Sequence, residues 1–425
     1  MAQSITNKAL ISTSSTTDLL IVGNGFDLRC GLKTSYNDFI NYILDKIFKG
    51  FDEIHEYSGD TILEKVMSLF DSCLQNQIQK YSLPTDISKK FNLWYAILID
   101  RNLQKTANWN SIEDAIYNFL TNKSVNNLER AFKDIHNTIQ WYPSDPSPYS
   151  LANKIYYLLR EIILCKYGEN DKYSEFIEKV YQDPSSLKDS LKVDLYTILK
   201  SELESFENDF QRYINYIMNS SAEGNNDNQR VNDIKTTVEL AGNSTSPTYL
   251  NIITFNYTGY WERLKSAIPY INNIHYVHGL AGSCNTQTPE IIFGIDSTGI
   301  DKSSPIYPFT KEYRTFSLYT KPSQNIYTSN PYPDKVRNIH IYGHSLAPAD
   351  YGYFRMIFTK YKDDPNTRFW FHYSTHSGLS AEKIHAQQVT AISALFDRYT
   401  AESPENQFLF QDLIQTGRIK INEIS

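Results

Sequence analysis

The sequence predicts an α/β fold in which a doubly wound, mostly parallel sheet is interrupted by a large helical insertion. Three observations lead to this prediction. An apolar run, a glycine-rich turn and an amphipathic segment follow one another over residues 18–48. Helical periodicity then fills most of residues 49–220, and strand patterns return only after residue 245. There they alternate with short helices, which is typical of a parallel sheet covered on both faces.

The first element of this fold is the apolar run of residues 18–22, which is short enough to be a buried parallel strand. It leads into the glycine-rich turn GNGFDLRCG. Ser35 and Asp38 then have the spacing of a helix-capping box, and apolar pairs recur every four residues up to Phe48. Residues 18–48 are therefore the expected first strand, turn and helix, and residues 1–17 are expected to be a disordered tail.

The second region, residues 49–245, is expected to form the helical insertion and a polar linker. An apolar stripe between Leu195 and Ile217 predicts one long amphipathic helix. The polar stretch of residues 219–235 has low complexity and predicts a linker or a surface loop. Glu113 of the insertion is either a catalytic acid or a solvated helix residue, and we favour the solvated residue.

Residues 246–425 are expected to complete the sheet. Lys311 and Arg314 lie in this region and are interpreted as surface charges rather than as phosphate ligands. The predicted strands cover residues 249–257, 271–279, 290–296, 337–345 and 367–374, and the predicted helices lie near residues 258–267, 349–361 and 380–399.

Composition excludes several classes of function. The 425 residues include 41 Lys and Arg against 48 Asp and Glu, a net charge of −7 that gives no general attraction to nucleic acid or anionic lipid. No segment approaches the ~20 apolar residues that span a bilayer, so we expect no membrane association. The four cysteines have no C-x-x-C pair, which favours a reducing cytoplasm and no bound metal.

The glycine-rich turn is the first candidate binding element. Gly23, Gly25 and Gly31 follow a buried strand, where glycines let the backbone approach a phosphate and the next helix supplies free N–H groups. The usual dinucleotide fingerprint has a third glycine where this chain has Leu28. A tight strand-to-helix turn explains the same glycines equally well.

Polar residues also follow three other predicted strands. Asn256, His278 and Ser345 each lie at a strand end, and parallel strands bring their carboxyl ends to one edge of the sheet. Taken singly, each is a turn-forming or structural residue; together they predict a nucleotide site. This site comprises Asn256 and His278 as catalytic residues, and Gly23, Asn24, Gly25, Asp27, Gly31, Thr254, Gly343, His344 and Ser345 for nucleotide binding.

The motifs GNGFDLRCGLKTSYNDF, ITFNYTGYWE, YVHG, FGID and YGHSLAPAD, in this order, resemble the AbiH family of phage abortive-infection proteins. The resemblance extends over nearly the whole chain. It implies an anti-phage protein that answers to a phage-derived trigger, and it leaves open whether the chain forms a homo-oligomer.

A more distant resemblance is to the sirtuins and the sirtuin-like defence NADases. Their glycine loop is similar to Gly23, Gly25 and Gly31, and their catalytic H-G is similar to His278 and Gly279. This resemblance implies a Rossmann-like, sirtuin-like core that binds NAD. The departures argue against protein deacylation: Asp27, Phe255 and Thr258 replace the Ser, Gln and Asp of sirtuins, and the cysteine-rich zinc module is absent.

Two functions follow from these resemblances. The first is NAD⁺ glycohydrolysis to nicotinamide and ADP-ribose, in which Asn256 positions water or ribose and His278 acts as a base. The alternative is a non-catalytic module that senses NAD⁺, ADP-ribose or a related adenine nucleotide, while the insertion contacts a phage or host partner.

Overall fold

The computed structural model places six strands in one all-parallel sheet with the order β3-β2-β1-β4-β5-β6. This confirms the predicted α/β class and the parallel sheet. The strands are β1 (Thr17–Val22), β2 (Tyr249–Thr254), β3 (Ile271–Tyr276), β4 (Asn338–Tyr342), β5 (Arg368–Tyr373) and β6 (Ile419–Glu423). The structure describes residues 17–49, 64–66, 85–99, 111–121, 124–133, 151–168, 189–220, 225–239, 249–281, 290–319, 330–374 and 380–424. Residues 1–16 of the predicted tail (residues 1–17) lie outside these ranges, and Thr17 belongs to β1 instead.

Strand β1 lies in the middle of the sheet although it comes first in the chain. It pairs with β2 on one side and with β4 on the other, and Leu19 to Val22 are buried. The strand order reverses direction on the two sides of β1, and ligands of open parallel sheets bind beyond the carboxyl ends of the strands at such a reversal.

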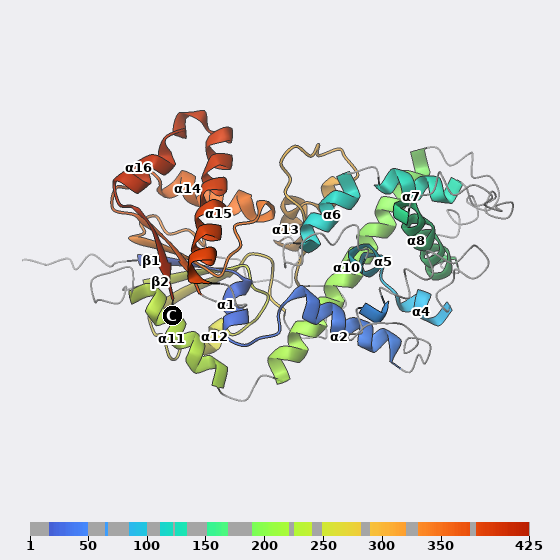
Figure 1. Ribbon diagram of the computed structural model, residues 1–425, viewed down its shortest axis with the longest axis horizontal. Coiled ribbons are helices and arrows are strands. Elements are labelled where there is room, and N and C mark those ends of the chain that lie inside the picture. The colour runs from blue at the N-terminus through green and yellow to red at the C-terminus, as the bar shows by residue number, and fades with distance from the viewer. Residues whose placement is uncertain are drawn as a thin grey trace, which may run out of the picture.

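Helices cover both faces of the sheet (Figure 1). One face packs on α14 (Tyr351–Tyr361), α15 (Ala381–Glu402) and α16 (Leu409–Gln415). The other face packs on α1 (Asn24–Arg29), α11 (Asn225–Glu239) and α12 (Trp261–Leu264).

The helical insertion has its own apolar core, which extends into the chain segments after β2 and β3. Phe39, Trp94 and Phe206 of the helices share this core with Tyr257 and Phe293. The longest helix, α10, runs along the insertion toward α2 (Figure 1). The helices here are α2 (Tyr36–Phe48), α4 (Thr85–Lys90), α5 (Leu93–Ile99), α6 (Ser111–Thr121), α7 (Ser124–Lys133), α8 (Leu151–Tyr167) and α10 (Asp189–Ser220), with α13 (Lys311–Tyr319) beside α6.

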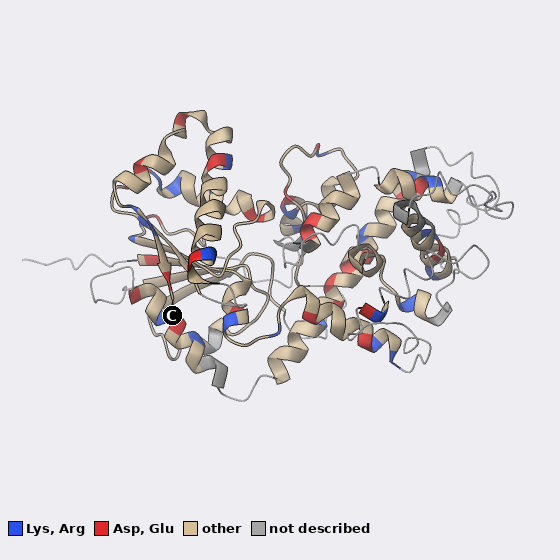
Figure 2. Cartoon of the chain, viewed as in Figure 1, with Lys and Arg blue, Asp and Glu red and all other residues tan. Residues whose placement is uncertain are grey.

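Charged residues of both signs are distributed over the sheet region and the helical region (Figure 2). The expectation that the chain has no general attraction to polyanions stays a prediction. None of the described helices combines the length and the apolar composition that a membrane span requires.

The predicted helix start at Ser35 is confirmed, since its side chain accepts the backbone N–H of Asp38 at 3.2 Å at the beginning of α2. The predicted strand at residues 290–296 is wrong, because only isolated bridges form there. Side chains of α10 accept hydrogen bonds from backbone N–H groups that would otherwise bond to a neighbouring strand. Gln211 accepts from the N–H of Glu290, and Glu207 accepts from the N–H of Phe293.

The linker predicted at residues 219–235 is also wrong, because α11 begins at Asn225. Its buried face combines Ile234 and Val238 with the polar side chains of Arg230, Asp233 and Thr237, so its apolar stripe is narrow and gives a weak helix signal. Asp233 pairs with Arg29 of α1 at 2.7 Å, which fixes the helix against the sheet region. Strand β6 was missed because only half-buried and exposed residues form this edge strand.

Candidate functional site

The chain segments that follow β1, β2, β3 and β4 meet at one edge of the sheet. The backbone N–H of Gly23 donates to Tyr342 at 3.0 Å, and that of Phe255 donates to Val22 at 2.8 Å. Val277 donates in the same way to Thr254 at 2.9 Å. Sheet hydrogen bonding therefore continues past the strand ends and places the predicted site residues along this carboxyl edge.

The glycines after β1 pack directly on the turn after β4. A Cβ atom on Gly23 would lie 2.6 Å from the carbonyl oxygen of Gly343, and Gly25 donates its N–H to that oxygen at 2.8 Å. Gly343 has a φ of +66°, and a Cβ there would lie 2.4 Å from the nitrogen of Phe26. These glycines thus permit close contact between two turns, while their predicted role in phosphate binding remains a prediction.

Gly31 and Asn24 have structural roles in the same loop. Gly31 has a φ of +78° and ends α1, where Gly31 and Leu32 donate to the carbonyl groups of Leu28 and Asp27, each at 3.0 Å. This pattern is a Schellman motif, which favours glycine. The Asn24 amide donates to the carbonyl oxygen of Thr34 at 3.2 Å.

A first group of polar residues, the Asp27 cluster, comprises Asp27, Asn256 and Thr258. The Thr258 hydroxyl donates to Asp27 at 2.7 Å. Burial raises the pKa of Asp27 to about 6, against the effects of Thr258, the Arg230 charge and the nearby Asn256 amide. Asn256 is 3% exposed, and neither its side-chain oxygen nor its nitrogen has an aligned hydrogen-bond partner in the described part of the chain.

A second group, the Asp350 cluster, comprises Glu113, His278, Lys311, His344 and Asp350. The Lys311 ammonium lies 2.9 Å from one Glu113 oxygen and 3.0 Å from the other, and it also contacts Asp350. Nε2 of His344 lies 3.2 Å from Asp350 Oδ2. Nε2 of His278 lies 3.2 Å from Asp350 Oδ1 but is not aligned as in a hydrogen bond.

Burial and the central ion pair set the protonation states in the Asp350 cluster. Burial opposes ionisation of Asp350, but the Lys311 charge together with the interactions of His278 and His344 outweighs it and holds the pKa of Asp350 well below its usual value. Burial, assisted by Lys311, lowers the pKa of His278 to about 4, so this imidazole is neutral at pH 7. Burial raises the pKa of Glu113 to about 7 even though Lys311 acts in the opposite direction.

Aromatic rings connect the two clusters. Phe255 and Tyr257, on either side of Asn256, lie 5.4 and 6.0 Å from the His278 ring, centroid to centroid. Phe255 also lies 4.4 Å from His344. The Asn256 amide interacts with Asp27, so Asn256 belongs to the Asp27 cluster, while the adjacent rings of Phe255 and Tyr257 lie beside the Asp350 cluster. The structure thus brings His278 and His344 together and places Asn256 with Asp27.

Three residues of the Asp350 cluster were missed or misinterpreted in the sequence. Glu113 was taken as solvated and Lys311 as a surface charge, yet their side chains are only 14% and 7% exposed. Arg314 was misinterpreted in the same way, since it pairs with the buried Glu207 of α10. Asp350 carried only the weak signal of an acidic residue shortly after a predicted strand end. Ser345, in contrast, is exposed.

No group of three or more His, Cys, Asp or Glu side chains among the described residues has an arrangement that could hold a metal ion. The expectation of a metal-free protein stays a prediction. The turn after β4 is conformationally unusual, because Leu346 has a φ of +57° and donates its N–H to His344 Nδ1 at 2.9 Å. That bond leaves the proton of a neutral His344 on Nε2, directed at Asp350.

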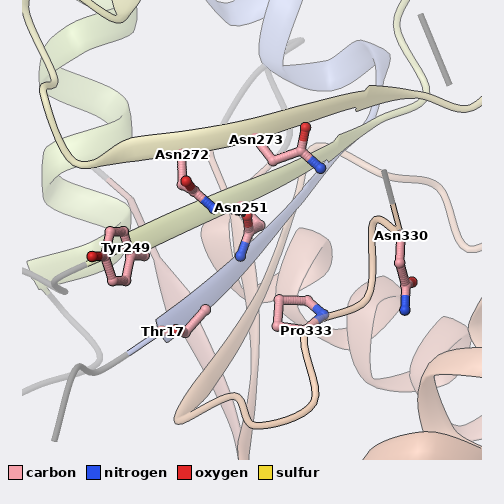
Figure 3. A pocket seen from close by; sticks show the side chains of 7 residues that line it. All are labelled: Thr17, Tyr249, Asn251, Asn272, Asn273, Asn330 and Pro333. Atoms are coloured by element: carbon pink, nitrogen blue, oxygen red, sulfur yellow. Dashed lines mark hydrogen bonds between the residues drawn. The ribbon is translucent and has the colours of Figure 1, made fainter. Parts of the chain in front are cut away.

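A pocket of about 430 Å³ lies at the amino ends of the strands, away from both clusters (Figure 3). Two of its side chains bond to each other, with Asn272 donating to Asn251 at 3.0 Å. Because parallel sheets bind ligands at their carboxyl edge, we do not assign the nucleotide site here. The lining residues are Thr17, Tyr249, Asn251, Asn272, Asn273, Asn330 and Pro333.

The described residues define an α/β protein with an all-parallel sheet, a buried ion cluster at its carboxyl edge and a helical insertion that contributes to the cluster. The family model for "Bacteriophage abortive infection AbiH" matches residues 19–373, so the chain belongs to the AbiH family of bacteriophage abortive-infection proteins. Comparisons with curated proteins and with solved structures gave no match.

Proposed function

We propose that this chain is an abortive-infection effector that cleaves NAD⁺ into nicotinamide and ADP-ribose in the cytoplasm of the infected cell. The strand order β3-β2-β1-β4-β5-β6 supports a Rossmann-like core, because many dinucleotide-binding sheets have this order. The sirtuin-like motif matches at Asn256 and His278 support the same substrate.

The observation that carries this proposal is the buried amide of Asn256. Its nitrogen is near enough to lower the pKa of Asp27, but its side-chain oxygen has no aligned partner among the described residues. Leaving a buried group without a hydrogen bond costs about 1–3 kcal/mol and calls for an explanation. A bound ligand is one such explanation. An amide can donate and accept, so Asn256 can hold a ribose hydroxyl or the attacking water.

The Asp350 cluster supplies the remaining chemistry. Nicotinamide leaves as a neutral molecule, so the protein must chiefly fix the sugar, stabilise positive charge and activate water. His278 is neutral and can accept a hydrogen bond from a ribose hydroxyl. Its lowered pKa makes it a weak base at pH 7, whereas Glu113, with a pKa of about 7, has the strength expected of a general base.

The direct test is incubation of purified protein with NAD⁺, with and without extract from phage-infected cells, followed by chromatographic detection of nicotinamide. We expect Asn256→Ala and His278→Ala to lower the rate because they remove groups that hold the ribose and the water, and Glu113→Gln to lower it by roughly 10²–10⁴-fold through loss of the general base. His385→Ala serves as the matched control, because His385 is exposed on α15. Equal turnover by the wild-type and His278→Ala proteins would contradict the catalytic role.

A second candidate, a non-catalytic nucleotide sensor, is favoured by the internal bonding of the site. Gly25 already donates to Gly343, and Lys311 is paired with Glu113 and Asp350. A nucleotide phosphate would have to displace these contacts, and the rearrangement would pass to the insertion through Glu113, as a sensor requires. Calorimetric binding of NAD⁺ or ADP-ribose without nicotinamide release, together with capture of a phage or host partner through the insertion, would favour this candidate.

A further inference from the structure

We propose that Glu113, which the helical insertion contributes, makes the site selective for substrates whose scissile ring carries a positive charge. These are N-ribosylpyridinium compounds, as opposed to neutral N-ribosides or reduced nicotinamides. The inference rests on the proposed function for its substrate class. It assigns the insertion a direct part in substrate recognition.

The first argument is the charge balance of the Asp350 cluster. The charges of Lys311 and Asp350 cancel in a buried ion pair. His278 is neutral because burial and Lys311 lower its pKa to about 4. The Nδ1 atom of His344 accepts the backbone N–H of Leu346 and so carries no proton. Ionised Glu113 therefore leaves one negative charge unbalanced.

The described groups around Glu113 do not supply a second positive charge. The backbone N–H of Gly294 helps to stabilise its carboxylate, while the charge of Asp350 disfavours it. Tyr257 stays protonated, since burial raises its pKa well above the usual value. Asp114, the next residue of α6, adds a further exposed carboxyl group. A bound cation would balance Glu113 and lower its pKa, so that binding near pH 7 releases a proton.

The second argument comes from the aromatic rings beside the cluster. Phe255, Tyr257 and Tyr353 lie 5.4, 6.0 and 6.1 Å from the His278 ring. Aromatic faces attract cations, and such rings beside a carboxylate recognise charged, planar ligands. His278 itself is 5% exposed, and its Nε2 has no aligned hydrogen-bond partner among the described residues.

The cluster is also within reach of solvent. The side chains of Glu113 and Asp350 are 14% and 12% exposed, and Tyr353 is half-buried. Glu113 and Tyr353 both interact electrostatically with Tyr257, so the carboxylate and the ring lie around the same buried side chain.

The test compares two ligands that differ in the charge of the nicotinamide ring. Carbocyclic NAD⁺ has a cationic ring and resists cleavage, whereas NADH has a neutral ring. Isothermal calorimetry with wild-type protein should show carbocyclic NAD⁺ binding more tightly by about 5-fold to about 1,000-fold, the range that one unit charge about 4 Å away gives between bulk water and an effective dielectric constant near 20. Glu113→Gln should abolish this preference, and the matched control Asp114→Asn should retain it.

Proton release provides a second readout that needs no variant. At pH 7, titrations in phosphate and in Tris should show release of about half a proton per bound carbocyclic NAD⁺, because a group with a pKa near 7 is half protonated there. NADH should release none, and neither ligand should release protons from Glu113→Gln.

Equal wild-type affinity for the two ligands, or a preference that survives Glu113→Gln, would overturn the inference. If that variant does not fold, absence of proton release from the wild-type protein overturns it equally. If the protein produces nicotinamide from NAD⁺ but binds carbocyclic NAD⁺ and NADH equally well, only this inference is refuted. If the protein prefers carbocyclic NAD⁺ but produces no nicotinamide, only hydrolysis is refuted. Failure of both ligands to bind refutes both proposals.

Discussion

Replacing Glu113 by Gln removes the carboxylate that the insertion contributes to the Asp350 cluster. The free energy of unfolding should then depend less on pH. The pKa of Glu113 is raised from 4.5 to about 7 by burial. A carboxyl group whose folded-state pKa is raised destabilises the fold when it ionises. The stability that protonation confers is therefore present below pH 4.5 and is lost as the pH rises through 7.

The size of the effect follows from the shift. At 1.36 kcal/mol per pKa unit, Glu113 should lower the free energy of unfolding by about 2–3 kcal/mol between pH 5 and pH 8. Other buried groups, including Asp27 and Glu207, titrate in the same range. The informative quantity is thus the difference between Glu113→Gln and wild type, in which those contributions cancel.

Urea denaturation at pH 5, 6, 7 and 8 measures this difference. Glu113→Gln should gain about 2–3 kcal/mol relative to wild type between the two extremes, while the control Asp114→Asn should gain less because Asp114 is exposed. A difference between Glu113→Gln and wild type that does not change with pH would refute the argument that Glu113 is ionised at a cost in the cluster.

Three further predictions concern the packing of the site. Gly343→Ala should destabilise by more than ~3 kcal/mol, because it combines a φ of +66° with a close approach to Phe26; Gly299→Ala, at a φ of +77° in open space, should cost less in the same urea experiment. Arg314→Met should cost about 3–5 kcal/mol in the free energy of unfolding, because it leaves Glu207 buried without its cation. The double variant Arg314→Met/Glu207→Gln should recover most of this loss. A double variant as unstable as Arg314→Met would argue against the ion pair as the cause. Lys311→Met should raise the pKa of His278, since the Lys311 charge lowers it, and a titration of the histidine ¹⁵N resonances that shows no rise would contradict the proximity of the two groups.

Local patterns predicted those parts of the fold whose signals lie within a few residues. The run from Leu19 to Val22 is apolar because β1 is buried on both faces, and Ser35 and Asp38 cap α2 as expected. In contrast, α11 buries Arg230 and Asp233 as well as apolar residues, so the helical spacing of its buried positions cannot be recognised from apolar residues alone. Its helical structure depends on partners elsewhere, such as Arg29.

The candidate site was only partly predictable for the same reason. His278 and His344 could be placed at one sheet edge, because parallel strands align their carboxyl ends. Glu113 and Lys311 are 198 residues apart, and nothing in their local sequences distinguishes a buried ion pair from two surface charges. Only the packing of α6 against α13 shows that they belong with Asp350.

The central claim is that the carboxyl-edge site destroys NAD⁺ during infection. Its most direct test is the NAD⁺ content of phage-infected cells that express wild-type or Asn256→Ala/His278→Ala protein at equal levels, measured alongside phage yield. The account predicts that NAD⁺ falls after infection and phage yield drops only with the wild-type protein. Protection by the wild-type protein at constant NAD⁺, or full protection by the double variant, would contradict it.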